Sequence, residues 1–277
     1  AYDFGYISAG RLAERTAHTL ATMAALERYQ GHFYNWYDTQ SLQPLLPTYV
    51  STVDSGNLAA HLLTLRPGLL AIPDCSIVNA RLFEGLIDTL GIVFEAVAGA
   101  LPDRLVQLKK DLETAYDSRP TTLTATRDWL ERLAESASVV TGSLDAVAEK
   151  DGYWWANALA RQCRDVLDDL IYLAPFTASS SSTNGFGNLA GIDKIPTLRE
   201  LARLAADLVA AIDRQLAAIG THATHDECER LTELKSLVTL ASQRARDRIA
   251  ANERIALQAG DTAAMDYDFL YDPSRHL

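Results

Sequence analysis

The chain has 277 residues, which allows one or two domains with a sizeable core and excludes a peptide-sized binding module. Its 36 acidic and 25 basic residues give a net charge of −11, and the pI is about 5.0. Such a charge disfavours nucleic acids and anionic membrane surfaces as partners, and no basic patch in the sequence opposes it. A hydrophobic content of 48% is typical of a globular protein rather than a disordered one.

Neither a transmembrane helix nor a disulfide framework is expected. The nearest approach to a membrane span, residues 89–101, is interrupted by Glu95 and is shorter than the roughly 18 uncharged residues that a span requires. An odd number of widely spaced cysteines argues for a reducing compartment. These cysteines are Cys75, Cys163 and Cys228.

Apolar residues recur mostly at helical spacing, and about eight helices are predicted. The clearest stripes cover residues 12–26, 155–170 and 198–219, and a capping box formed by Thr197 and Glu200 precedes the third. The other predicted helices cover residues 55–65, 76–100, 102–116, 122–150 and 225–259, with a turn at Asp151 and Gly152. Long helices with short connections predict an all-α fold of antiparallel neighbours.

Two stretches interrupt this helical pattern. Residues 32–39 and 48–54 are aromatic and β-branched, which predicts a small extended hairpin or a pair of structured loops. Residues 176–195 are rich in Ser, Gly and Asn, which predicts a solvated surface loop. A mobile lid over a site is the alternative interpretation of this second stretch.

Candidate binding residues concentrate between residues 31 and 62, in a short non-helical region that leads into a helix. Sugars are bound by aromatic faces that stack on the ring and by polar groups that read the hydroxyls, and loops on a rigid scaffold can present both. The alternative is that the rings pack beneath the loop while Asp54 caps a helix that begins near Ser55. The predicted substrate-binding residues are His32, Tyr34, Trp36, Tyr37, Asp38, Tyr49, Asp54 and Asn57.

Asp38 and Asp54 are the only carboxylates among these aromatic residues. Paired carboxylates perform most glycoside chemistry, one as acid or base and the other as base or nucleophile. Capping or hydrogen bonding to backbone amides explains each of them as well. We therefore assign no catalytic residue from the sequence.

Two further clusters have structural explanations. Tyr153 and Trp154 offer an aromatic platform, but core packing explains them and the neighbouring Trp155 as well. The spacing H-x-x-H-x-x-C lacks a fourth ligand, so no metal site is predicted. That cluster consists of His222, His225 and Cys228.

Four blocks of the sequence resemble the cyclic β-1,2-glucan synthases. They are residues 6–11 (YISAGR), 31–39 (GHFYNWYDT), 49–58 (YVSTVDSGNL) and 265–273 (MDYDFLYDP), and they occur in the family's order along nearly the whole chain. The two central blocks are long and unusual, which makes the resemblance specific.

The resemblance implies a large enzyme of the bacterial inner membrane. Its membrane-embedded glycosyltransferase segment uses UDP-glucose, and its C-terminal segment is similar to glycoside phosphorylases. Between them, a glycoamylase-like segment similar to an α/α barrel acts as a transglycosylase that closes linear β-1,2-glucan into a ring. The chain would be the N-terminal part of this middle segment, on the cytoplasmic face, and would itself need no cofactor.

Both ends of the chain look like cuts, because it begins without Met and stops at Leu277 where the family continues. We therefore expect the principal catalytic carboxylates beyond this point and an inactive fragment. Residues 1–75 would form part of a sugar cleft, and residues 76–277 a helical bundle that leads into the missing part of the barrel. The expected partners are β-1,2-glucan and other segments of the polypeptide, without nucleic acid or direct membrane insertion. The alternative function is a non-catalytic helical scaffold that joins the glycosyltransferase and phosphorylase-like segments.

Overall fold

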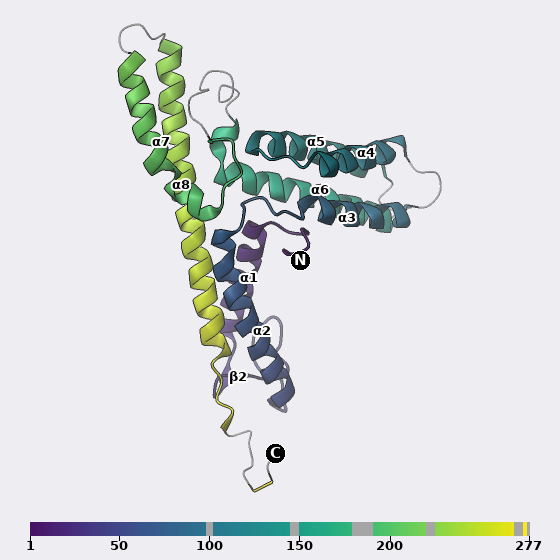
Figure 1. The fold of residues 1–277 in the computed structure, drawn as a ribbon. Coiled ribbons are helices and arrows are strands. Elements are labelled where there is room, and N and C mark those ends of the chain that lie inside the picture. Colours follow the sequence, from purple (N-terminus) through teal and green to yellow (C-terminus); the bar gives the residue numbers. More distant parts are fainter. Residues whose placement is uncertain (98–101, 145–149, 179–190, 220–224, 269–273, 276–277) are drawn as a thin grey trace. The chain divides into compact units, whose positions relative to one another are not determined.

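The computed structural model describes residues 1–97, 102–144, 150–178, 191–219, 225–268 and 274–275 (Figure 1). These residues form eight α-helices, two short 3-10 helices and one two-stranded hairpin, which confirms the all-α class. The chain divides into two compact units. Unit 1 contains Ala1–Leu12 and Pro73–Arg248, and unit 2 contains Ala13–Ile72 and Ile249–Leu277. The functional division near residue 75 stays a prediction, as does the barrel that the resemblance implies.

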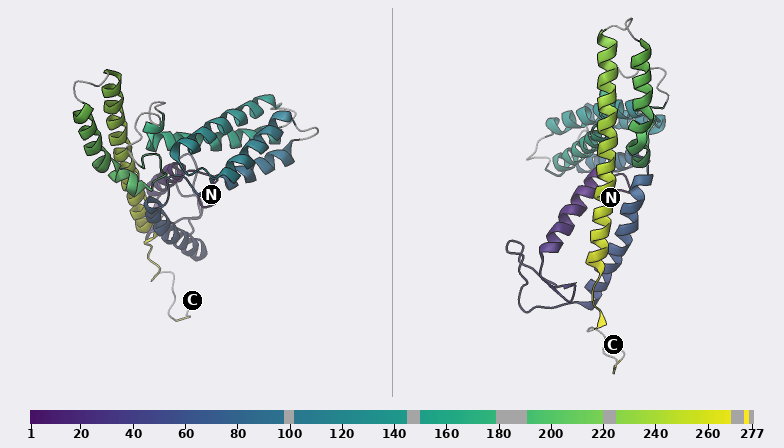
Figure 2. Two further views of the ribbon diagram at one scale, coloured as in Figure 1. Left: turned by 45° about the horizontal axis from the view of Figure 1, so that its top comes forward. Right: turned by 90° about the vertical axis from the view of Figure 1, so that its left-hand side faces the viewer.

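Four helices of unit 1 form a closed bundle. They are α3 (Leu82–Ala96), α4 (Asp103–Ser118), α5 (Leu123–Ser143) and α6 (Lys150–Leu173). Each helix packs against the next one along the chain, and α6 also packs against α3, so each has two neighbours (Figures 1 and 2). Their apolar stripes meet in a core that includes Leu86, Leu90, Leu105, Leu112, Leu130 and Leu159.

The N-terminal segment crosses α3 at a contact between two glycines. Gly5 has a φ of +75°, and a Cβ atom on it would lie 2.2 Å from the carbonyl oxygen of Arg81. A Cβ atom on Gly85 would lie 2.5 Å from the backbone of Gly5. The side-chain amide of Gln162 donates to the Gly5 carbonyl at 3.1 Å, while its oxygen accepts from Thr89 at 2.8 Å. Only glycine fits both positions, because the opposing atoms are backbone.

The predicted turn at Asp151 and Gly152 is wrong, because both residues lie in the first turn of α6. Gly152 is buried, and a Cβ atom there would lie 3.0 Å from a methyl group of Val97. The glycine therefore reflects close packing rather than a turn. Trp155 is half-buried and Trp154 is 53% exposed, so neither ring is enclosed in the core.

The third predicted stripe forms α7 (Leu198–Ile219), and its capping box is confirmed. The Thr197 amide donates to Glu200 Oε2 at 2.7 Å, and the Glu200 amide donates to Thr197 Oγ1 at 3.1 Å. The hydrogen bond from the Thr197 amide lowers the pKa of the Glu200 carboxyl below its ordinary value. The predicted capping therefore fixes the start of this helix.

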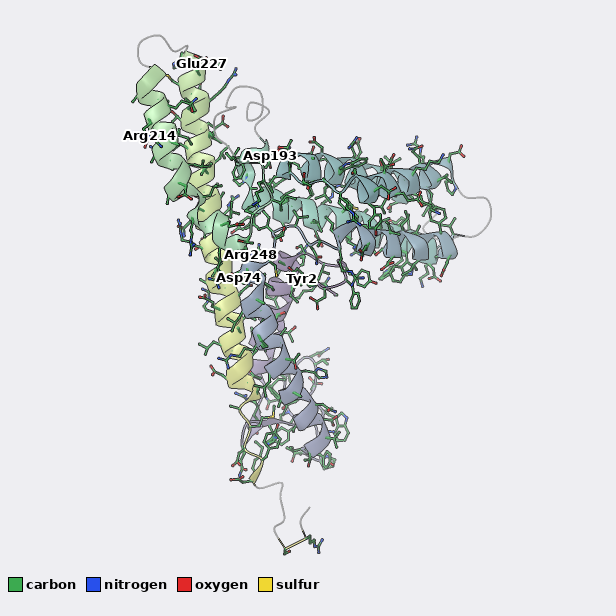
Figure 3. The ribbon with its side chains drawn as sticks, viewed as in Figure 1. Tyr2, Asp74, Asp193, Arg214, Glu227 and Arg248 are labelled. Carbon is green, nitrogen blue, oxygen red and sulfur yellow. The ribbon has the colours of Figure 1, made fainter. Side chains whose placement is uncertain are left out.

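A buried ion pair in unit 1 joins α6 to α8 (His225–Ala263). Arg248, labelled in Figure 3, places its Nη2 atom 2.8 Å from Asp169 Oδ1, and these side chains are only 15% and 11% exposed. The Gly10 amide, near the start of α1 (Ala9–Ala25), donates to Asp169 Oδ2 at 3.0 Å. A Cβ atom on Gly10 would lie 2.4 Å from Asp169 Oδ1, so this contact also requires glycine.

Three helical stretches build unit 2, namely α1 from residue 13, α2 (Thr52–Ala71) and α8 from residue 249. They run side by side (Figures 1 and 2). The Arg66 side chain of α2 lies against Gly260 of α8, where a Cβ atom would meet Arg66 Cδ at 3.4 Å. The buried apolar residues of this unit include Ala13, Leu20, Ala59, Leu62, Leu69, Ile255, Ala256 and Ala259.

The hairpin is present, but its position differs from the prediction. Strands β1 (Arg28–Tyr29) and β2 (His32–Phe33) pair antiparallel, so residues 32–33 pair with residues 28–29 and not with residues 48–54. Gln30 and Gly31 form the connection with positive φ values. Thr52 already begins α2, so the end of the second predicted strand is helical.

No helix in the described part of the chain is long and apolar enough to cross a membrane. Most of the Ser-rich stretch, residues 179–190, lies outside the described residues, so the lid interpretation concerns a part of the chain that the structure does not describe. The same is true of His222 in the H-x-x-H-x-x-C cluster.

Candidate functional site: the aromatic loop of unit 2

Asn35 holds together the loop that carries most of the predicted site residues. Its backbone amide donates to the Tyr49 carbonyl at 2.9 Å. Its side-chain oxygen accepts from the Ser51 amide at 3.1 Å, and its side-chain nitrogen donates to Asp54 Oδ2 at 3.3 Å. One side chain thereby joins the strand-like residues after the hairpin to the start of α2, where Ser51 is the N-cap.

Tyr37 and Asp38 direct their polar atoms at the loop itself. The Tyr37 hydroxyl donates to the Glu27 carbonyl at 2.7 Å and accepts from the Tyr34 amide at 2.8 Å. Partial burial raises the pKa of the Tyr37 hydroxyl above its ordinary value. Asp38 Oδ1 accepts from the Ser41 amide at 2.7 Å, the Ser41 hydroxyl at 2.9 Å and the Gln40 amide at 3.0 Å, and these bonds lower its pKa. Both residues therefore stabilise the loop conformation.

Trp36 and Tyr49 form an exposed aromatic pair on this loop. Their ring centroids are 6.3 Å apart, the planes are inclined by 28°, and each side chain is 55% exposed. The Trp36 carbonyl accepts from the Leu45 amide at 3.0 Å, which fixes the backbone beside the indole. With half of their surface exposed, the two rings lie outside the core and form an open platform.

His32 lies beneath the loop and is fully buried. Its Nε2 atom lies 2.5 Å from the Asp266 carbonyl oxygen, so Nε2 carries the proton that is donated. The Tyr267 ring stands edge-on to the imidazole at 5.0 Å, and the Tyr267 hydroxyl donates to the Ser55 carbonyl at 3.3 Å. His32 thus anchors the segment after α8 to the hairpin, and Tyr267 anchors it to α2.

The remaining predicted residues lie at the rim of the platform. Asp54 and Asn57 are exposed on the first turns of α2, and Tyr34 is half-buried with its ring 6.3 Å from that of Tyr37. The alternative in which Asp54 caps a helix at Ser55 is wrong in position, because the helix begins at Thr52 and Ser51 accepts the Asp54 amide. Asp54 instead places its charge in the first turn, where the helix dipole stabilises it.

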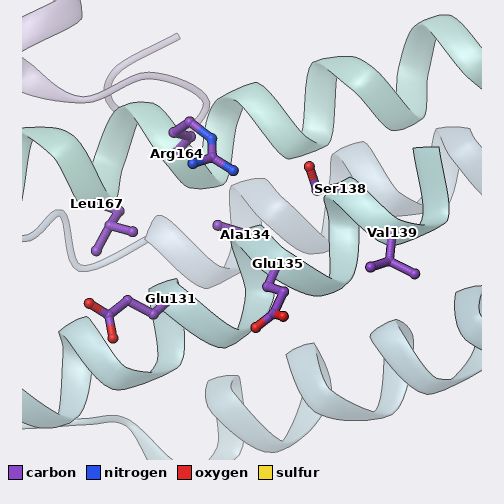
Figure 4. Close-up of a pocket in the computed structure, with 7 residues that line it drawn as sticks. All are labelled: Glu131, Ala134, Glu135, Ser138, Val139, Arg164 and Leu167. Atoms are coloured by element: carbon purple, nitrogen blue, oxygen red, sulfur yellow. The ribbon is translucent and has the colours of Figure 1, made fainter. Parts of the chain in front are cut away.

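A hollow lies on unit 1, between α5 and α6 (Figure 4). It has a volume of about 570 Å³, and Glu131 and Glu135 from successive turns of α5 line it together with Arg164 of α6. Glu131 is already bound to Arg127 at 2.7 Å. None of the predicted site residues lines this hollow. The one sequence signal for it is the four-residue spacing of Glu131 and Glu135, which places both carboxylates on the same face of a helix.

The described residues contain no metal cluster, and one of their cysteines, Cys163, has a buried thiol. No group of three or more His, Cys, Asp or Glu side chains in this part of the chain is arranged to hold a metal ion. Burial raises the pKa of the Cys163 thiol to about 12, so it stays protonated at neutral pH.

No protein-family profile matches the chain. A curated protein does match it, because all 277 residues align, at 28% identity, with a segment of the cyclic β-(1,2)-glucan synthase NdvB of Rhizobium meliloti (strain 1021). The resemblance predicted from the four blocks is thereby confirmed. The chain spans only 8% of the length of this relative.

Three of the four blocks meet at the aromatic loop. Block 31–39 contacts block 49–58 through the bonds of Asn35 and the Trp36–Tyr49 pair. It also contacts the described start of block 265–273 through His32 and Asp266. The Tyr267 hydroxyl donates to the Ser55 carbonyl, so block 265–273 also contacts block 49–58. Block 265–273 lies more than 200 residues from the other two in sequence, yet all three belong to one local structure.

Proposed function

We propose that this chain is a segment of an enzyme that makes cyclic β-1,2-glucan, and that its aromatic loop binds the glucan chain. The observation that carries the proposal is the Trp36–Tyr49 pair, two rings that are each 55% exposed on a loop closed by hydrogen bonds. Contiguous exposed apolar surface with a polar rim is one mark of a ligand-binding site.

The chemistry of a glucose ring fits this platform. The axial C–H groups of a β-glucosyl unit form an apolar face that stacks on an indole or phenol ring. The polar rim is supplied by Asp54 and Asn57, both exposed on the first turns of α2. A carboxylate has about four acceptor positions, and Asn35 occupies one on Asp54, which leaves capacity for sugar hydroxyls.

The eight predicted residues divide into two roles in this proposal. Trp36, Tyr49, Asp54 and Asn57 contact the sugar. The remaining four, His32, Tyr34, Tyr37 and Asp38, hold the loop in place, because the side chains of His32, Tyr37 and Asp38 hydrogen-bond to protein groups and the Tyr34 amide bonds to Tyr37. Rigid loops bind more tightly because less conformational freedom is lost on binding.

We place the transglycosylation carboxylates outside residues 1–277 and the whole enzyme at the cytoplasmic face of the inner membrane. In this scheme the chain contributes substrate binding, UDP-glucose is used by another segment, and the isolated chain neither hydrolyses nor cyclises β-1,2-glucan. Incubating the chain with linear β-1,2-glucan and analysing the products by mass spectrometry tests this. Turnover by the chain alone would contradict the placement.

Calorimetric titration with linear β-1,2-glucan tests the binding site directly. Trp36→Ala should weaken binding by about 1–3 kcal/mol, roughly 5- to 150-fold in Kd, since a stacking ring is lost. Trp36→Phe should retain much of the affinity. The matched control is Trp154→Ala, which removes an equally exposed indole, 53%, from α6 of unit 1. Equal losses for Trp36→Ala and Trp154→Ala, or no binding at all by the chain, would refute the site.

A helical scaffold is the second candidate function. It is favoured by the closed bundle α3–α6, which carries none of the predicted sugar-contacting residues. Deleting residues 76–248, which lie within unit 1, from the whole synthase should then prevent assembly of its other segments, and normal assembly would argue against a scaffold. The two functions are compatible, because they use different units of the chain.

A further inference from the structure

Helix α2 carries a second apolar stripe that its own unit does not cover. Positions 53, 56, 60, 63, 67 and 70 are separated by steps of three and four residues, so they lie on one face. All six are apolar and exposed, and Val53, Leu63 and Leu70 are 71%, 55% and 40% exposed. The buried stripe of the same helix uses other positions, namely Ser55, Ala59, Leu62 and Leu69.

The space outside this stripe is open and carries little charge. A Cβ atom built on Gly56 meets nothing within 4 Å, and the same is true of the exposed Gly68. Among the 20 residues of α2, only Asp54 and Arg66 are charged, whereas charged residues make up 22% of the whole chain. Depletion of charge around exposed aliphatic residues is typical of the centre of a protein interface.

We infer that this outer stripe of α2 is the docking surface for an amphipathic helix from another segment of the same synthase polypeptide. The alternating spacing matches a partner helix that crosses at a shallow angle, with Leu, Ile or Val at positions three and four residues apart. Gly56 and Ala60 leave room for large side chains at one end of the stripe, and Leu63 and Leu70 fill small positions of the partner at the other.

The size of the stripe decides between a tethered helix and a second copy of the chain. Eighteen residues span about 26 Å, so one helix about 10 Å wide covers roughly 260 Å² of the surface. This is well below the roughly 800 Å² per partner of a standard interface between separate proteins. A tethered segment has an effective concentration in the millimolar range and therefore occupies even such a weak site. The chain spans only 8% of its relative, so most of such a polypeptide lies outside residues 1–277.

Radical footprinting of the isolated chain and of the whole synthase tests the inference. In the whole synthase, hydroxyl-radical oxidation of Leu63 and Leu70 should fall about tenfold relative to the isolated chain. This is the decrease expected when the effective concentration of the tethered helix is about ten times its Kd, because only about a tenth of the sites then stay open to solvent. Leu63→Glu should restore the oxidation of Leu70. His61→Glu should not restore it, because His61 is exposed on α2 outside the stripe.

Unchanged oxidation of Leu63 and Leu70 in the whole synthase would overturn the inference. Light scattering of the isolated chain supplies the second outcome. A mass that stays at 30.3 kDa as concentration rises supports a tethered partner, whereas a dimer that Leu63→Glu abolishes would identify a second copy as the occupant. The inference rests on the proposed membership of a longer synthase but not on sugar binding by Trp36. Calorimetry on the isolated chain measures sugar binding by Trp36 separately from docking on α2.

Discussion

In unit 1 the helices α3–α6 each pack against two neighbours, whereas in unit 2 the helix α2 buries one apolar face and leaves another in solvent. Within unit 1, the N-terminal segment also lies against α3, where Gly5 and Gly85 allow backbone contact. Unit 2 instead holds its long loop by hydrogen bonds to Asn35 and Asp38. The comparison shows that helices α3–α6 of unit 1 cover one another, while α2 of unit 2 keeps an exposed apolar face, for which we propose another segment of the polypeptide as the partner.

The buried ion pair of unit 1 should give the largest effect on stability. Asp169→Ala should lower the free energy of unfolding by about 3–5 kcal/mol, because Arg248 and the Gly10 amide lose their shared partner in a nearly water-free position. Urea denaturation measures the loss. The control is Asp213→Ala, whose pair with Lys235 is 49% and 37% exposed and should contribute about 0–1 kcal/mol. Similar losses for both variants would show that unit 1 does not depend on this contact.

Two adjacent leucines of α2 separate its covered face from its open face. Leu62 is 5% exposed and Leu63 is 55% exposed. In the isolated chain, Leu62→Ala should cost about 2–5 kcal/mol of unfolding free energy, because it leaves a cavity. Leu63→Ala should change it by less than about 0.5 kcal/mol. Hydrogen exchange of the α2 amides measures both values, and equal losses would mean that the chain itself covers the outer face.

Features that depend on local sequence could be predicted, and features that depend on distant contacts could not. The capping box of Thr197 and Glu200 sets the start of α7 through neighbouring residues alone. By contrast, the helix predicted from residue 76 begins only at Leu82, because the Ile77 amide bonds to the Pro196 carbonyl. The sequence around Gly152 predicts a turn because glycine favours turns. The actual reason for this glycine is the close approach of Val97, which is a tertiary contact that local sequence does not reveal.

The same distinction applies to the candidate site. The residue types favoured a sugar platform, and Trp36 and Tyr49 are exposed and adjacent. The predicted site residues did not include Asn35, although three hydrogen bonds of the loop converge on it. Those bonds join residues 14 to 19 positions apart, so no spacing rule identifies them. Burial of His32 likewise depends on the segment at Asp266, more than 200 residues away.

Acid should loosen the loop of unit 2 around Asp38. The hydrogen bonds from Ser41 and Gln40 hold the pKa of Asp38 below its ordinary 3.8 in the folded loop. A group with a lowered folded pKa stabilises the folded form above its unfolded pKa, and this stabilisation is lost as pH falls through the folded value. The Ser41 amide signal in NMR spectra should therefore stay constant from pH 7 to about 4 and change only below that. In Asp38→Asn the amide oxygen still accepts but does not titrate, so this change should disappear. A transition of the Ser41 amide near neutral pH, or one that persists in Asp38→Asn, would mean that another group holds the loop closed.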